Sequence, residues 1–178
     1  MSRHKDNLCK EEIETFNDAV HVVLLKEEAR LLNDLKQSQF KDFKIFNAED
    51  YFSDGREVTP ESIPKKIEAD VPRKLKLAVG SKVMLKVNID VSSGLVNGLL
   101  GTVTEFDVDD NYDTIIMVKF DDSFKNNFER FRLSYPIKPY KFRTRVAHKR
   151  YFIRRQYPLI HSWAINVHKV QGITLNKA

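Results

Sequence analysis

The sequence has one cysteine, Cys9, among its 178 residues. A single cysteine rules out an internal disulfide and a zinc site built on several cysteines, and it fits a reducing compartment. No apolar run approaches the roughly 20 residues that span a bilayer, and residues 1–10 lack the apolar stretch of a secretory signal. With 42% hydrophobic and 31% charged residues, the composition is that of a globular domain that can bury a core. We therefore expect an intracellular protein without a membrane partner.

Acidic residues are absent from the last part of the chain. Between Phe131 and Ala178 there is no Asp or Glu, whereas Lys and Arg recur throughout, and the formal net charge of +5 arises there. A basic block beside a mildly acidic one indicates a polyanion partner for one face. A solvated basic surface, or one balanced by acidic residues of a neighbouring domain, would give the same pattern.

Nucleotide- and metal-binding motifs are missing as well. The sequence has no G-x-x-x-x-G-K-[ST] loop to cradle phosphates and no paired acidic magnesium motif in an apolar strand. The aspartates between Asp107 and Asp122 lack the ordered spacing of a calcium loop and are interpreted as solvated turns. We expect no metal site, no catalytic residue and no ATP hydrolysis by the chain alone.

The first part of the chain has an α/β pattern. Residues 20–25 form a short β-branched run, which predicts a buried strand, and residues 26–36 carry an apolar stripe at helical spacing. A strand followed by a helix is the repeating unit of α/β domains. Residues 44–46 predict a further strand, and residues 53–64, with Gly55, Pro60 and Pro64, predict a loop.

After Pro72 the pattern changes to short strands separated by turns. Strands are predicted over residues 75–77, 82–87, 101–106 and 114–120. Several short strands at this spacing indicate a small antiparallel barrel. A last strand over residues 151–155 would lead back to the α/β part.

The segment from Ser162 to Gly172 can be interpreted in two ways. Apolar residues at Trp163, Val167 and Val170 favour a helix that ends near Gly172. Alternation of Ile165 and Val167 with polar neighbours would instead fit a strand. The shared face of the helical spacing makes the helix our prediction.

Two longer segments resemble a known family. Residues 75–103 read LKLAVGSKVMLKVNIDVSSGLVNGLLGTV, and residues 155–175 read RQYPLIHSWAINVHKVQGITL. Both resemble helicases of the Pif (petite integration frequency) type, including the transposon-borne Helitron kind, and the second resembles helicase motif V. Residues 11–33 are weakly similar to the family's approach to motif IV. The sequence departs from the family at residues 24–26, which stand in place of Pro-Thr-Asn, at Val170, in place of serine, and at Asn166, in place of threonine.

The resemblance implies a fold and a domain order. The fold would be α/β, an incomplete RecA-like motor domain with an inserted small antiparallel β-barrel of the Src-homology-3 type. Residues 1–74 would be part of the second RecA-like motor domain, residues 75–155 the inserted barrel, and residues 156–178 the return to the motor domain with motif V. Because the P-loop and motif VI are missing, the chain would be a piece of a longer helicase or a decayed transposon copy.

The implied function is part of an ATP-dependent 5′-to-3′ DNA helicase. ATP and Mg²⁺ would be cofactors of the intact parent, and single-stranded DNA and the first motor domain would be partners. A nuclear or mitochondrial location would follow. The alternatives from other classes are a non-enzymatic nucleic-acid-binding module and a protein-interaction barrel.

Motif V supplies the first candidate site. Lys169 offers a charge for phosphate, and His168 and Gln171 can hydrogen-bond phosphate or sugar. The resemblance implies that Gln171, Gly172 and Thr174 also couple the DNA track to the nucleotide cleft.

A second group of candidates lies in the barrel region. Asn97 stands in a Gly94-to-Gly98 turn, where Gly98 and Gly101 are expected to leave backbone amides bare for a phosphate or base; a plain barrel turn is the alternative. Lys141 and Arg143 alternate with aromatic residues, as in single-stranded nucleic acid grooves. The alternative there is that the rings of Tyr140 and Phe142 belong to the core.

Overall fold

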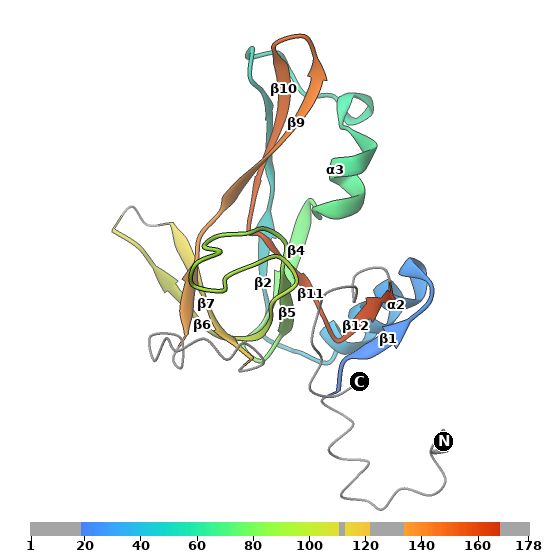
Figure 1. Cartoon of the computed structure of the whole chain (residues 1–178), viewed down its shortest axis with the longest axis vertical. Helices are drawn as coiled ribbons and strands as arrows, with labels where there is room; N and C mark the ends of the chain where they lie inside the picture. The colour runs from blue at the N-terminus through green and yellow to red at the C-terminus, as the bar shows by residue number, and fades with distance from the viewer. Residues whose placement is uncertain (1–18, 111–112, 122–133, 168–178) are drawn as a thin grey trace, which may run out of the picture.

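The computed structural model describes residues 19–110, 113–121 and 134–167, and it is mostly β-sheet with few helices. Two helices and twelve strands in these ranges build an elongated molecule with the β9–β10 hairpin at one end (Figure 1). The strands are β1 His21–Val23, β2 Lys44–Asn47, β3 Glu49–Phe52, β4 Lys74–Leu77, β5 Lys82–Leu85, β6 Leu100–Val108, β7 Thr114–Phe120, β8 Tyr135–Ile137, β9 Tyr140–Ala147, β10 Arg150–Gln156, β11 Leu159–His161 and β12 Ala164–Asn166. The helices are α2 Lys26–Gln37 and α3 Lys65–Asp70, with a 3-10 turn, η2, at Pro60–Ser62.

The largest sheet is five-stranded and antiparallel, in the order β11-β5-β6-β7-β8. Its inward residues pack against the β2–β4 pair around one core, which includes Leu75, Leu77, Leu85, Ile116 and Leu159. Burying each such side chain contributes roughly 1.5–3 kcal/mol, so this core is the main stabilising unit of the described chain. The strands predicted at residues 75–77, 82–87, 101–106 and 114–120 are confirmed. Their closure into a barrel of the Src-homology-3 type stays a prediction.

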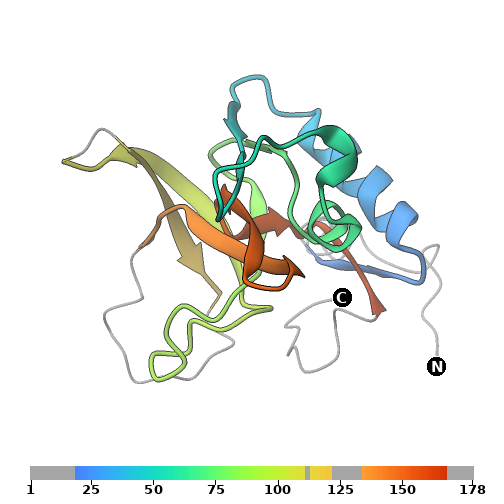
Figure 2. The ribbon, with the colours of Figure 1, turned by 90° about the horizontal axis from the view of Figure 1, so that it is seen from above.

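A second sheet carries the hairpin. Strands β3, β10 and β9 pair antiparallel in that order, and α3 lies along the hairpin (Figure 1). Phe52, Ile67 and Phe152 form a separate core between this sheet and α3, with Phe142 packed against it. Seen from above, α2 and the β6–β7 ribbon lie on opposite sides of the molecule (Figure 2).

The third unit is the parallel pair β1–β12, with α2 beside it. The amide of Asn33 joins α2 to β12 by donating to the Ala164 carbonyl at 2.8 Å and accepting from the Ala164 N–H at 2.9 Å. The predicted helix at residues 26–36 and strand within residues 20–25 are confirmed. A parallel pair with a helix after its first strand is an α/β arrangement.

The helix predicted from Ser162 is wrong for Ala164–Asn166, which form β12. All three residues are buried, and Ile165 packs on Met84 and Leu100. The segment forms a strand because it pairs with β1 and all three of its residues are buried. A pattern of only three residues does not distinguish a strand from a helix.

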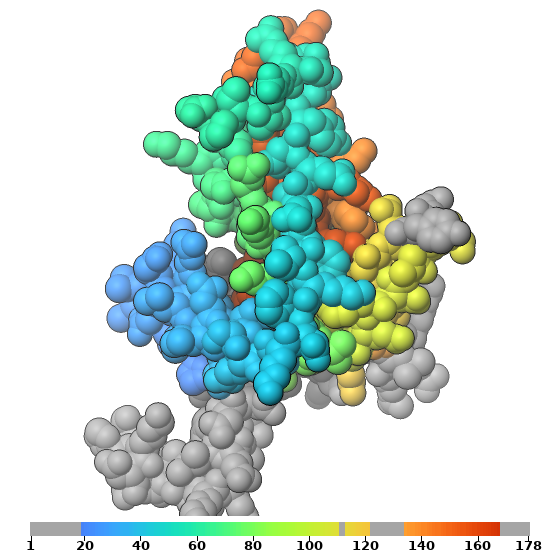
Figure 3. All heavy atoms as spheres, turned by 180° about the vertical axis from the view of Figure 1, so that it is seen from behind, coloured from blue at the N-terminus to red at the C-terminus, as the bar shows by residue number. Residues whose placement is uncertain are grey.

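Strands β2 and β3, residues 44–52, pair with β4 and β10 respectively. This segment therefore shares its sheets with residues predicted as the insert, and it runs along the surface between α2 and the β6–β7 ribbon (Figure 3). The boundary at residue 74 remains a prediction. No helix in the described part of the chain is long and apolar enough to cross a membrane.

Candidate nucleic-acid interface

The predicted site residues fall into two groups. Those of motif V lie outside the described residues: His168, Lys169, Gln171, Gly172 and Thr174. Asn97 lies in the loop between β5 and β6, and Lys141 and Arg143 lie on β9.

Two backbone N–H groups of the Asn97 turn donate hydrogen bonds to residues outside the turn. The Asn97 N–H donates to Oδ1 of Asn88 at 2.8 Å, and the Gly98 N–H donates to the Leu85 carbonyl at 2.8 Å. Gly98 has a φ of +97°, a conformation that glycine adopts easily and other residues rarely do, which explains why a glycine stands at this position. The side chain of Asn97 is exposed, so it remains a candidate contact.

The prediction that Gly98 and Gly101 leave their backbone amides bare for a ligand is wrong. The Gly98 N–H is bonded as described, and Gly101 is buried in β6, paired with Val83 on one side and Phe120 on the other. A Cβ at Gly101 would lie 2.8 Å from the Lys119 carbonyl oxygen. Gly101 therefore allows the close approach of neighbouring strands and offers no surface to a ligand.

On strand β9 the cations and the aromatic rings of the basic run lie on opposite faces. Residues 140–147 alternate, so Tyr140 and Phe142 point to one face, and Lys141 and Arg143 point to the other. Phe142 packs against the core that contains Ile67 of α3, as the core alternative predicted for this ring. Tyr140 is 43% exposed on the same face as Phe142. The rings at 140 and 142 therefore do not share a face with the cations.

The cation-bearing face of the sheet is open. Cross-strand pairing puts three rows on it: Glu49, Arg155 and Lys141; Tyr51, Ile153 and Arg143; and Tyr151 with Arg145. Lys141, Arg143 and Arg145 are all exposed along the β9 edge. Tyr51, Tyr151 and Ile153 are half-buried beside them.

A hollow of about 640 Å³ lies on this face. Its lining consists of Tyr51, Phe52, Ser53, Gly55, Lys141, Arg143 and Ile153. The guanidinium of Arg143 lies over the ring of Tyr151, 3.7 Å from its centroid. Cations, aromatic rings and an aliphatic side chain thus meet in a space of the size that small-molecule and nucleotide pockets have.

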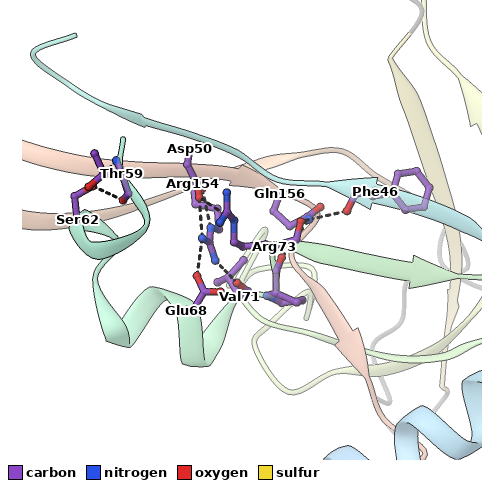
Figure 4. Close-up of polar contacts among 10 residues, drawn as sticks. Phe46, Asp50, Thr59, Ser62, Glu68, Val71, Arg73, Arg154 and Gln156 are labelled. Carbon is purple, nitrogen blue, oxygen red and sulfur yellow. Dashed lines mark hydrogen bonds and ion pairs between the residues drawn. The ribbon is translucent and has the colours of Figure 1, made fainter. Parts of the chain in front are cut away.

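The opposite face of the sheet is anchored to α3 by a buried arginine (Figure 4). Arg154 donates to Asp50 from Nε at 2.7 Å and from Nη2 at 2.8 Å, to Glu68 at 2.9 Å, and to the Val71 carbonyl at 2.6 Å. Burial lowers the pKa of Arg154, but its hydrogen bonds to the carboxylates of Asp50 and Glu68, and their negative charges, outweigh the burial, so the pKa is raised. The guanidinium is therefore charged and fixes β10 between β3 and α3.

Gln156 extends this anchoring toward the main core. Its Nε2 donates to the carbonyl of Phe46 at 3.1 Å and of Pro72 at 3.2 Å (Figure 4). Together, Arg154 and Gln156 make the back of the sheet rigid, while its front carries the cations.

The sequence pattern indicated Arg145 as part of the same basic run, but it did not indicate that Tyr51, Tyr151 and Ile153 belong to this face. The sequence does contain the signal of an amphipathic strand, because cations alternate with less polar residues at Lys141, Phe142, Arg143, Thr144 and Arg145. Tyr51 has no such signal, because β3 reaches the face only through its pairing with β10.

The chain has relatives of known type. Residues 66–106 match the family model for the 2B domain of the DNA helicase Pif1. The ATP-dependent DNA helicase PIF1 of Xenopus laevis is 36% identical over 117 residues, which are 63% of this chain and 16% of that protein. The same helicase of Danio rerio is 35% identical over 109 residues, 61% of this chain and 15% of that protein.

Solved structures agree with the sequence matches. The Pif1 helicase of Candida albicans superposes with a TM-score of 0.70 at 23% identity, covering 97% of this chain and 44% of that one. Unliganded Pif1 from Bacteroides superposes with a TM-score of 0.61 at 25% identity, covering 90% of this chain and 45% of that one.

The matched segment, residues 66–106, is thus similar to a Pif1 2B domain, and the fold around it is similar to that of solved Pif1 helicases. In sequence and in fold the chain is similar to Pif1-type helicases. It spans about a sixth of the length of the curated relatives it matches.

Proposed function

We propose that this chain is part of an ATP-dependent, 5′-to-3′ DNA helicase, in which it contributes contacts to single-stranded DNA and couples them to the ATP cleft. The family match supports helicase membership. A Bacteroides Pif1 structure that superposes with a TM-score of 0.62 contains ADP-AlF3 and single-stranded DNA. A nuclear or mitochondrial location is part of the same proposal.

The observation that carries the DNA-binding part is the row of exposed cations on β9. Lys141 and Arg143 project from one face of a sheet whose back is fixed by Arg154. Phosphates of a nucleic acid are the anions that such a row recognises without regard to sequence. In the intact protein, Lys169 and its neighbours in motif V would add contacts and transmit them to the cleft.

The nucleotide site is assigned to the rest of the longer helicase. Among the described residues, no group of three His, Cys, Asp or Glu side chains could hold a metal ion. The sequence also lacks a P-loop. In this proposal the described residues hold DNA and support the neighbouring motor domain.

Binding of the purified chain to a labelled oligothymidine of about 15 nucleotides tests this function, measured by fluorescence anisotropy. Each phosphate neutralised on a single strand contributes a slope of about −0.7 in log K against log salt. Three to five contacts would therefore reduce affinity by roughly one to two orders of magnitude between about 50 and 200 mM salt. A flat salt response would support the protein-interaction alternative instead.

A further inference from the structure

The open face of the β3-β10-β9 sheet has a defined layout. Along β9, the side chains of Lys141, Arg143 and Arg145 follow one another at alternate positions, about 7 Å apart. Beside them, β10 presents Ile153 and Tyr151. A line of positive charge thus runs parallel to a line of apolar and aromatic surface.

The cations of this line lack partners of opposite charge. None of the ion pairs found among the described residues involves Lys141, Arg143 or Arg145. Two acidic residues of β3 and the loop after it have other partners: Glu49 pairs with Arg155 at 3.1 Å, and Asp54 pairs with Arg56 at 3.3 Å. The line is therefore available to an anion that comes from outside the described chain.

Arg143 is held in place before any ligand arrives. Its guanidinium covers the ring of Tyr151 at 3.7 Å, and a guanidinium stacked on a ring presents its other face to solvent. That face borders the hollow, together with Tyr51 and Ile153. A planar group entering the hollow would meet a guanidinium plane that already has a ring partner, and the aromatic ring of Tyr51.

We propose that this face binds a single-stranded nucleic acid, with phosphates along Lys141, Arg143 and Arg145 and an unpaired base in the hollow between Arg143 and Tyr51. The inference rests on the proposed function and identifies the surface and its ligand. Tyr151 is a positioning residue, because it acts through Arg143.

The hollow favours a single strand over the other polyanions. In a duplex the bases are paired and stacked, so only the phosphates would reach the face. An acidic peptide would match the cations but would leave the Tyr51 side of the hollow without a planar partner. Bases that stack on aromatic rings and guanidinium planes use both halves of the surface.

Substitution of Tyr51 tests the base contact in the full chain. We expect Tyr51→Ala to weaken binding of oligothymidine by about 5- to 100-fold, the range of a lost base–aromatic stack. The same variant should bind an oligonucleotide of equal length made of abasic sites as well as the wild type does. Phe43→Ala is the matched control, because Phe43 is an exposed ring (43%) outside the hollow, and it should leave both affinities unchanged.

Substitutions of Arg143 and Tyr151 separate charge from positioning. Arg143→Gln should reduce the salt slope by about 0.7, one phosphate. Tyr151→Ala should weaken oligothymidine binding, and Tyr151→Phe should restore it, since the ring face alone holds the guanidinium. Photocrosslinking of the wild type to an iodouracil oligonucleotide should join peptides that contain Tyr51 or Tyr151, and it needs no folded variant.

The outcomes distinguish this inference from the proposed function. If the wild type binds the oligonucleotide but the variants bind equally well and the crosslinks lie elsewhere, the assigned face is wrong while the function stands. If the wild type fails to bind, both are wrong. Tighter binding to a duplex or to polyglutamate than to the single strand would overturn the choice of ligand.

Discussion

Arg154 and Asp50 form a bidentate ion pair across neighbouring strands, in which Nε and Nη2 of Arg154 lie 2.7 and 2.8 Å from the two carboxylate oxygens of Asp50. The side chain of Arg154 is fully buried and that of Asp50 is 6% exposed, so neither charge reaches much solvent. The pair holds β10 to β3 directly behind the face that carries Lys141 and Arg143. Its integrity determines how well that face is ordered.

We therefore expect Arg154→Met to lower the free energy of unfolding by about 3–5 kcal/mol, because it leaves Asp50 buried without its main partner. Arg73, whose Nε lies 3.7 Å from Asp50, would keep the loss toward the lower end of that range. Arg155→Met is the control: Arg155 pairs with the exposed Glu49 and should change stability by less than about 1 kcal/mol. Urea denaturation measures both, and equal losses would contradict the importance assigned to Arg154.

Gly101→Ala should be destabilising because of steric crowding. The added Cβ would meet the Lys119 carbonyl oxygen and Val118 Cγ1 at 2.8 Å. Overpacking of this kind costs about 1–3 kcal/mol. At Gly55 a Cβ would have no neighbour within 4 Å, so the cost of Gly55→Ala comes only from its φ of +75° and should be about 1–2 kcal/mol. Thermal melts measure the loss of stability in both variants. The near-ultraviolet circular dichroism spectrum of the folded protein should change in Gly101→Ala, because the strands shift to make room for the methyl group. The spectrum of Gly55→Ala should stay as in the wild type.

Much of the fold can be predicted from local patterns. Short β-branched runs and turn residues indicated the strands at β1, β5, β6 and β7, and the apolar stripe indicated α2. Strand β12 was predicted as a helix, because its three residues gain their strand pairing only from β1, far earlier in the chain. Strands β3 and β9 and helix α3 were not predicted.

The open face is hard to predict for the same reason. Asp50 and Arg154 lie 104 residues apart in sequence, and the row that joins Tyr51 to Arg143 passes through β10. The sequence indicated cations interleaved with rings, but it did not show that the rings of Phe142 and Tyr140 face away from Lys141. Only the register of the three strands shows that Tyr51 and Tyr151 lie on the same face as the cations.

Lys169→Ala should weaken DNA binding by a similar factor for every oligonucleotide sequence, since a phosphate contact carries no base information. The expected signature is a salt slope smaller by about 0.7. Lys26→Ala, an exposed lysine at the start of α2, is the charge-matched control. Anisotropy with homopolymers of different bases measures the effect, and a loss confined to one base would argue against a backbone contact at Lys169.

The last prediction concerns His161, which stacks on Trp163 with ring centroids 5.1 Å apart. Burial lowers the pKa of His161 from 6.5 to about 4, and the Asp34 carboxylate and a hydrogen bond with the Lys76 backbone offset this only in part. The folded chain keeps the imidazole neutral, whereas the unfolded chain binds a proton below about pH 6.5. Stability is therefore fully present above pH 6.5 and is lost as the pH falls toward 4, by about 2 kcal/mol on going from about pH 7.5 to pH 5. His161→Phe keeps a ring against Trp163 and removes the titration, so urea midpoints of this variant should change less over the same interval. An identical pH dependence in the variant and the wild type would show that other groups carry the acid sensitivity.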